Sequence, residues 1–250
     1  TPRTRAIVTV DYGGNPSDVR ALMDLVEGTD IKVIQDAAQA LGAKVGGDPI
    51  GSIADYTTFS FQAVKHITTG DGGMLCFREK KQKDLAGRLR WFGIDRSAKQ
   101  KGIWENDIRE VGYKYQMTDV SASMGLAGLE ELDEILEHRR NLVSIYCSEL
   151  SSVEGLRVLG VEDSDLKSHG AWLMTVSVRD RRALQEKLLK HKIESNQVHY
   201  RNDKYEIFGG TRLDLPNMNQ LEDHYLVLPL HTSMGEKHVR KICSVIRAGW

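Results

Sequence analysis

The chain has 250 residues, with 34 lysines and arginines against 35 aspartates and glutamates, and a formal net charge of -1 at pH 7. This balance, without a block of like charge, gives no electrostatic support for a nucleic-acid or membrane partner, so we expect neither. Three scattered cysteines, Cys76, Cys147 and Cys243, lack the spacing of metal ligands, and the first residues lack the apolar core of a signal peptide. We therefore predict a soluble, cytoplasmic protein without a metal site.

The first part of the chain alternates strand-like and helix-like segments. Residues 6–10 and 31–34 are typical of strands, the first of them buried, and between them Asn15 is expected to cap a helix with one apolar face. The order strand, helix, strand implies a right-handed crossover, parallel pairing and an α/β fold. Farther on, Gly46 and Gly47 predict the turn of a small hairpin.

One lysine stands between two predicted strands. Residues 56–61 are β-branched and aromatic, residues 74–77 are apolar, and residues 68–73 between them are small, polar and rich in glycine. Lys65 is therefore expected to project from a loop in a rigid frame. Taken alone, a lysine is most often a solvated surface charge.

Three polar residues make Lys65 more informative. Asp36 and Gln39 follow the second predicted strand, and Ser60 precedes Lys65 by five positions. Ligands of open α/β sheets bind beyond the carboxyl ends of the strands, where we expect these side chains. A carboxylate, an amide, a hydroxyl and a lysine are the groups needed to hold pyridoxal phosphate (PLP), because the lysine forms a Schiff base and an acid keeps the ring nitrogen protonated.

The chain resembles the DegT/StrS-type sugar aminotransferases, within the fold type I PLP enzymes, over essentially its whole length. The matching stretches in chain order are DYGG at 11–14, QDAAQALGA at 35–43, GSIAD at 51–55, FSFQAVK at 59–65, TTGDGG at 68–73, GYKYQMTD at 112–119 and LPLH at 228–231. The resemblance implies that Asp36 pairs with the pyridinium nitrogen, Gln39 faces the ring's phenolic oxygen and Ser60 contacts the phosphate. It implies that Lys65 carries the covalent link to the cofactor.

The resemblance also implies a two-stage transamination. Glutamate gives its amino group to the cofactor, and the resulting pyridoxamine phosphate aminates a keto sugar attached to a nucleotide, with the nucleotide and the keto position left open. Lys65 is expected to move the proton, first as a base and then as an acid. A related sugar dehydratase carries histidine in place of the lysine. Here His66 only follows Lys65, which favours the aminotransferase.

Four further site residues are implied by the resemblance. Lys114 stands where the family more often has an asparagine that reaches the phosphate of the partner subunit's cofactor, so a homodimer is expected; a solvated Lys114 is the alternative. His199, Tyr200 and Arg201 lie where relatives bind the nucleotide part of the acceptor, and an ordinary surface role is the alternative for each.

The later elements suggest a second lobe. Thr118 is expected to open one long helix that spans on the order of 45 Å. It follows a predicted helix at 81–91 and a polar surface loop at 93–107. Beyond it, the predicted elements are strands at 171–178 and 197–200, a helix at 180–190 and a capping box at 233–236. We therefore predict a partial PLP-binding large domain with the long connecting helix at 1–150, and a small α+β domain at 151–250.

Members of the family usually carry a further N-terminal segment that grips the phosphate and stacks an aromatic on the ring. Its absence from this sequence leaves a second hypothesis, that of a truncated or catalytically silent module for binding or assembly. We expect such a chain, on its own, to bind the cofactor weakly and to leave a sheet edge uncovered.

Overall fold

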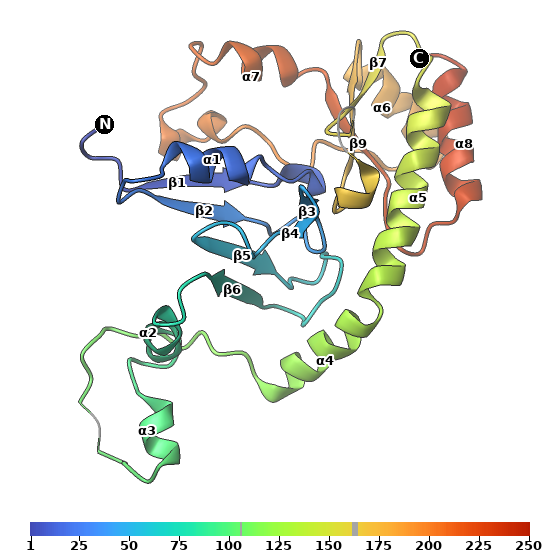
Figure 1. Cartoon of the computed structure of the whole chain (residues 1–250). Coiled ribbons are helices and arrows are strands. Elements are labelled where there is room, and N and C mark those ends of the chain that lie inside the picture. The colour runs from blue at the N-terminus through green and yellow to red at the C-terminus, as the bar shows by residue number, and fades with distance from the viewer. Residues whose placement is uncertain (106, 162–164) are drawn as a thin grey trace. The chain divides into compact units, whose positions relative to one another are not determined.

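The computed structural model describes residues 1–105, 107–161 and 165–250 (Figure 1). The chain forms two compact units, one made of residues 1–11 and 17–132 and the other of residues 12–16 and 133–250. We call them the N-terminal unit and the C-terminal unit. The predicted domain boundary at residue 150 stays a prediction.

The N-terminal unit is built on a four-stranded sheet in the order β1-β2-β5-β6. Strands β1 (Ala6–Val10), β2 (Lys32–Asp36) and β5 (Tyr56–Ser60) run parallel, whereas β6 (Gly73–Phe77) is antiparallel to β5. Helix α1 (Val19–Leu25) connects β1 to β2 (Figure 1). The predicted α/β class, the parallel pairing and the strand-loop-strand frame of Lys65 are confirmed.

Helix α1 packs through the apolar face that its periodicity predicted, but its cap differs. Val19 and Val26 are buried against Val33 of β2. The N-cap is Asp18, whose Oδ1 accepts from the amide of Ala21 at 3.1 Å. The prediction that Asn15 caps this helix is wrong, because the helix begins only at Val19, and the amide of Asn15 donates to the carbonyl of Tyr12 at 3.1 Å in a preceding turn.

Strand β1 forms one edge of the described sheet. Its Val8 and Val10 are 64% and 52% exposed. The prediction that this strand is buried is therefore wrong, since no described element packs over these two side chains. The short hairpin of β3 (Lys44–Val45) and β4 (Asp48–Pro49) forms as predicted.

Helix α2 (Gln82–Leu89) lies within the predicted 81–91 helix. The segment predicted to be a loop contains another helix, α3 (Arg96–Gln100). Asp95 explains the helix, because its Oδ1 accepts from the amides of Ser97 and Ala98 at 2.9 and 3.1 Å. The loop prediction is wrong for these residues.

The predicted long helix is two helices. Thr118 caps α4 (Asp119–Glu130) as expected, and its Oγ1 accepts from the amide of Ser121 at 3.2 Å. Helix α4 ends at Glu130, the amide of Glu131 bonds to the carbonyl of Leu129, and α5 (Leu132–Leu150) begins one residue later. The prediction of one uninterrupted helix is therefore wrong.

The C-terminal unit has a three-stranded antiparallel sheet in the order β7-β8-β9. Its elements besides α5 are β7 (Leu156–Leu159), β8 (Met174–Val178), α6 (Arg181–Lys190), α7 (Pro216–Leu221), β9 (Tyr225–Leu228) and α8 (Glu236–Arg247). One buried core joins α5, α6, α8 and the sheet, as Leu142, Leu188, Ile242 and Val176 illustrate. The predicted α+β character of this part is present.

Two predictions fail in the C-terminal unit. Residues 197–200 form no strand in the described chain, and Asn196 alone makes a bridge to Val227 of β9. Helix α8 begins after Gly235, whose amide donates to Nδ1 of His238 at 3.0 Å, so the predicted cap at 233–236 is misplaced.

Short 3-10 turns complete the chain at Tyr12–Gly14, Leu166–Ser168, Asn202–Lys204 and Glu206–Phe208. Among the described residues, no helix combines the length and the apolar character needed to cross a bilayer.

Candidate cofactor site

Two predicted cofactor ligands end neighbouring parallel strands. Asp36 is the last residue of β2 and Ser60 the last residue of β5, and Asp36 is in register with Thr58. The amide of Ala37 donates to the carbonyl of Thr58 at 2.9 Å, so the chain leaves β2 alongside β5. Gln39 is buried in the turn that follows β2. These groups therefore gather at the carboxyl edge of the sheet, where open α/β folds bind ligands.

Lys65 lies in a loop whose ends are tied together. Phe61, at the start of this loop, donates its amide to the carbonyl of Gly72 and accepts from the amide of Thr69, both at 2.9 Å. The amide of Lys65 donates to the carbonyl of Gln62 at 2.9 Å. The backbone of Lys65 is thereby fixed next to the end of β5.

The side chains of Lys65 and Asp36 act on each other electrostatically. Burial lowers the pKa of the Lys65 amine from its usual value, and the nearby Asp36 carboxylate opposes this shift. Asp36 is itself oriented, because its Oδ1 accepts from the amide of Ala38 at 3.0 Å. The structure thus brings the predicted catalytic amine and the predicted ring-nitrogen partner into one site.

Ser60 has a defined hydrogen-bonding role at this edge. Its Oγ accepts from the amide of Gln62 at 3.3 Å. A serine hydroxyl that accepts one bond still has its own proton to donate, and phosphate oxygens accept such protons. Ser60 therefore suits the role of a phosphate ligand.

Lys114 packs on an aromatic ring within the N-terminal unit. It bridges to Trp91, and its Nζ lies 5.0 Å from the centroid of that indole. The guanidinium of Arg96 lies 5.2 Å from the same centroid. Such cation–π contacts hold an exposed cation near the surface. The role of Lys114 at a partner subunit's phosphate stays a prediction.

The three predicted acceptor ligands lie in the C-terminal unit, and each has aromatic or polar partners there. The ring of His199 lies 5.5 Å from that of Tyr12 and 6.4 Å from that of Trp172. The hydroxyl of Tyr200 donates to Oδ1 of Asn196 at 2.9 Å. Neither Tyr12 nor Trp172 was singled out in the sequence, where an aromatic in a loop carries no distinctive pattern. The roles of His199 and Tyr200 toward an acceptor stay predictions.

Arg201 is engaged within its own unit. Its side chain is 2% exposed, and it donates two bonds to the Asp203 carboxylate, at 2.7 and 2.6 Å. Nη1 also donates to Asn219 at 2.6 Å and lies 3.3 Å from a Glu222 oxygen. These contacts give Arg201 a structural role, and its role as a nucleotide ligand stays a prediction.

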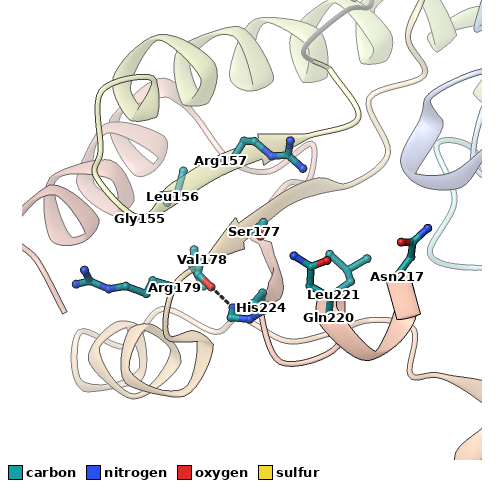
Figure 2. Close-up of a pocket in the computed structure, with 10 residues that line it drawn as sticks. All are labelled: Gly155, Leu156, Arg157, Ser177, Val178, Arg179, Asn217, Gln220, Leu221 and His224. Carbon is teal, nitrogen blue, oxygen red and sulfur yellow. Dashed lines mark hydrogen bonds between the residues drawn. The ribbon is translucent and has the colours of Figure 1, made fainter. Parts of the chain in front are cut away.

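None of these residues lines an open cavity of about 640 Å³ in the C-terminal unit. It is lined by Gly155, Leu156, Arg157, Ser177, Val178, Arg179, Asn217, Gln220, Leu221 and His224. Figure 2 shows the side chains of Arg157 and Arg179 pointing in opposite directions. The two arginine side chains therefore do not converge on one point in the cavity, and we assign it no ligand.

Asp11 is the residue of the site's surroundings that the sequence did not single out. It follows β1 as Asp36 ends β2, it is 0% exposed, and its Oδ2 accepts from Nε2 of Gln35 at 2.9 Å. The available signal was a carboxylate directly after an apolar strand, within the DYGG stretch.

The groups at the sheet edge fit PLP. A partly buried amine, an oriented carboxylate beside it and a hydroxyl donor on the next strand match the aldehyde, the ring nitrogen and the phosphate of that cofactor. The fold is that of the fold type I PLP transferases, as solved structures of the same architecture show.

Comparison with known proteins identifies the family. Residues 1–247 match the model of the DegT/DnrJ/EryC1/StrS aminotransferase family, and the chain belongs to it. It is 29% identical to the GDP-perosamine synthase of Escherichia coli O157:H7 over 98% of this chain and 66% of that protein.

Two solved structures illustrate the likeness. AtS13 from Actinomadura melliaura is 35% identical with a TM-score of 0.92, and the match covers 100% of this chain and 68% of that one. Spr1654 from Streptococcus pneumoniae, in its PLP form, is 27% identical with a TM-score of 0.87, over 99% and 69% of the two chains. The chain thus spans about two thirds of the length of these relatives.

Proposed function

We propose that the protein is a PLP-dependent aminotransferase that moves an amino group from glutamate to a keto sugar attached to a nucleotide. The observation that carries the proposal is the partly buried amine of Lys65 under the influence of the Asp36 carboxylate, at the strand edge that also bears Ser60. Membership of the family supports it. Relatives named as GDP-perosamine synthase and as transaminases of dTDP- and UDP-linked sugars support a role in nucleotide-sugar and polysaccharide biosynthesis.

Lys65 is the proposed catalytic residue. When bound, PLP supplies an electron sink for the carbon that carries the amino group. Burial lowers the pKa of the Lys65 amine, so a larger share of the amine is unprotonated and able to accept a proton than in a surface lysine. The same amine, now protonated, would then act as a general acid and return the proton to the cofactor carbon on the other side of the amino nitrogen.

The remaining residues are proposed to hold and orient the cofactor. The Asp36 carboxylate keeps the ring nitrogen protonated, which strengthens the electron sink, and Ser60 donates its hydroxyl proton to the phosphate. Gln39, buried in the turn after β2, would face the phenolic oxygen of the ring. In a homodimer, Lys114 adds a positive point charge near the partner's phosphate.

His199, Tyr200 and Arg201 are proposed to face the nucleotide of the acceptor. Which nucleotide and which keto position are accepted depends on pocket shape, and GDP-, dTDP- and UDP-linked sugars are all candidates. We place the enzyme in the cytoplasm, where nucleotide sugars and glutamate are available.

The test uses the full-length natural polypeptide with PLP. Glutamate should convert the bound cofactor to its aminated form, followed by absorbance, and one of the nucleotide-linked keto sugars should restore the original spectrum. Lys65→Ala should bind PLP without either change, and Lys44→Ala, at an exposed position of the hairpin, is the matched control. Exclusive amination of simple 2-keto acids would contradict the sugar acceptor. Bound cofactor without turnover would favour the silent module.

A further inference from the structure

A second carboxylate lies in the protein core next to Asp36. Asp11 directly follows β1, and its amide donates to the carbonyl of Asp36 at 3.0 Å. Successive side chains of a strand point to opposite faces, so Gln35, which contacts the Asp11 carboxylate, and Asp36 face opposite sides of the sheet. The Asp11 carboxylate therefore lies on the face of the sheet opposite to the Asp36 side chain.

Asp11 ends a relay of buried polar groups across three parallel strands. Its Oδ2 accepts from Gln35 Nε2 at 2.9 Å, and Gln35 Oε1 accepts from Thr57 Oγ1 at 3.4 Å. All three residues are 0% exposed. The other carboxylate oxygen, Oδ1, accepts from the amide of Ser17 at 2.9 Å. Donors on both oxygens suit a negatively charged carboxylate.

The charge of Asp11 has no cationic partner in the part of the chain that the structure describes. Burial raises the pKa of Asp11, the hydrogen bonds from Ser17 and Gln35 lower it, and the charge of Asp36 raises it further. Asp36 is thus a charged group that acts on Asp11, whereas its hydrogen-bond partners Ser17 and Gln35 are neutral. A buried carboxylate without a counter-ion is costly to the folded protein.

We propose that Asp11 is a positioning residue for the cofactor. Its buried negative charge, acting together with that of Asp36, favours the protonated form of the ring nitrogen of bound PLP. The proposal rests on the proposed function. A fixed anion in a medium of low dielectric constant raises the proton affinity of every group near it. Asp36 would contact the ring nitrogen of bound PLP, and Asp11 would act through Asp36 from the opposite face of the sheet.

Three variants of the full-length protein separate charge from packing. Asp11→Asn removes the charge and keeps the shape. Thr57→Val breaks the far end of the relay and keeps the charge, as the matched control. Asp11→Asn combined with Gln35→Glu exchanges amide and carboxylate between neighbouring strands, which keeps one negative charge in the relay.

Two measurements report on the cofactor without turnover. NMR of PLP with an isotope-labelled ring nitrogen reports the protonation of that atom, and a titration gives the dissociation constant of PLP. In Asp11→Asn, we expect a smaller protonated fraction and PLP binding weaker on the order of tenfold, which corresponds to about one pKa unit. Thr57→Val should leave the protonated fraction unchanged, and the exchange variant should restore it.

Unchanged ring protonation in a folded Asp11→Asn protein would overturn the inference, as would an equal change in Thr57→Val. If Asp11→Asn does not fold, Asp11→Ser, which also removes the charge, takes its place: a reduced protonated fraction supports the inference and an unchanged fraction overturns it. A wild-type protein that binds no PLP overturns the proposed function together with the inference. A wild type that binds PLP, with Asp11→Asn unchanged, overturns the inference alone.

Discussion

The amine of Lys65 and the carboxylate of Asp36 influence each other although Lys65 lies in the loop after β5 and Asp36 at the end of β2. Burial lowers the pKa of Lys65, and Asp36 partly offsets that shift. The position of Asp36 is fixed by the end of β2, and the position of Lys65 by the loop that the hydrogen bonds of Phe61 close. Burial thus favours the neutral, reactive form of the Lys65 amine and makes its charged form costly to the folded protein, and the Asp36 carboxylate reduces that cost.

Replacing Lys65 is therefore expected to stabilise the protein without cofactor. The pKa of Lys65 in the folded protein lies below its value of about 10.4 in the unfolded chain. Between these two pKa values the unfolded state binds more protons than the folded state, so stability rises with pH. Lys65→Met should unfold at higher denaturant concentration than wild type at neutral pH, and the difference should shrink as the pH approaches the unfolded value. Lys44→Met, at an exposed position, should show no such trend. A constant difference at all pH values would contradict the prediction.

Borohydride reduction of the PLP-loaded full-length protein should label Lys65. The amine lies in a loop that is fixed next to the end of β5, and the Asp36 carboxylate acts on it, so a permanent link at this residue is expected. Peptide mapping by mass spectrometry locates the label. A label on another lysine, or none despite bound cofactor, would show that Lys65 is not the attachment site.

Asp36→Asn should retain part of the cofactor binding and lose turnover on the order of a hundredfold, because a neutral amide does not hold the ring nitrogen protonated. Single-turnover rates with glutamate measure the loss. Asp48→Asn, which alters an exposed carboxylate paired with Arg20, is the control and should leave the rate unchanged. An unchanged rate in Asp36→Asn would remove Asp36 from the mechanism.

The strand ends that carry the site were predictable, because Asp36 and Ser60 each close a run of apolar or β-branched residues. The burial of Asp11 was not, since it depends on Gln35 and Thr57 from two other strands. The strand predicted at 197–200 failed for a similar reason: Gln197 is buried and donates to the carbonyl of Glu222. The local alternation of apolar and polar residues in the sequence does not reveal partners that are distant along the chain.

Arg201→Lys separates a structural role from a role toward the acceptor. The planar guanidinium bonds to both oxygens of Asp203 and to Asn219, and an ammonium cannot reproduce this fork. We expect the free energy of unfolding to fall, because the Asp203 carboxylate and Asn219 lose hydrogen-bond donors that an ammonium does not replace. Denaturant unfolding measures this loss. A protein of unchanged stability with a raised KM for the nucleotide sugar would instead establish Arg201 as an acceptor ligand.

His169 should make the C-terminal unit sensitive to acid. Its Nδ1 accepts from the amide of Ala171 at 2.8 Å, and burial lowers the pKa of His169 to about 4. As the pH falls below the unfolded value of about 6.5, the unfolded state takes up a proton that the folded state refuses, so stability is lost between about pH 6.5 and 4. The full loss is on the order of 3 kcal/mol. Hydrogen exchange of the β8 amides at several pH values measures it.

The matched variants are His169→Gln, which keeps an acceptor for the Ala171 amide but does not titrate, and His191→Gln at an exposed position. The first should flatten the acid dependence of exchange in β8, and the second should leave it as in wild type. Protonation of His169 would place a proton on Nδ1 facing the donor of Ala171, so the neutral ring is required for this contact. An acid dependence that persists unchanged in His169→Gln would assign it to other groups of the unit.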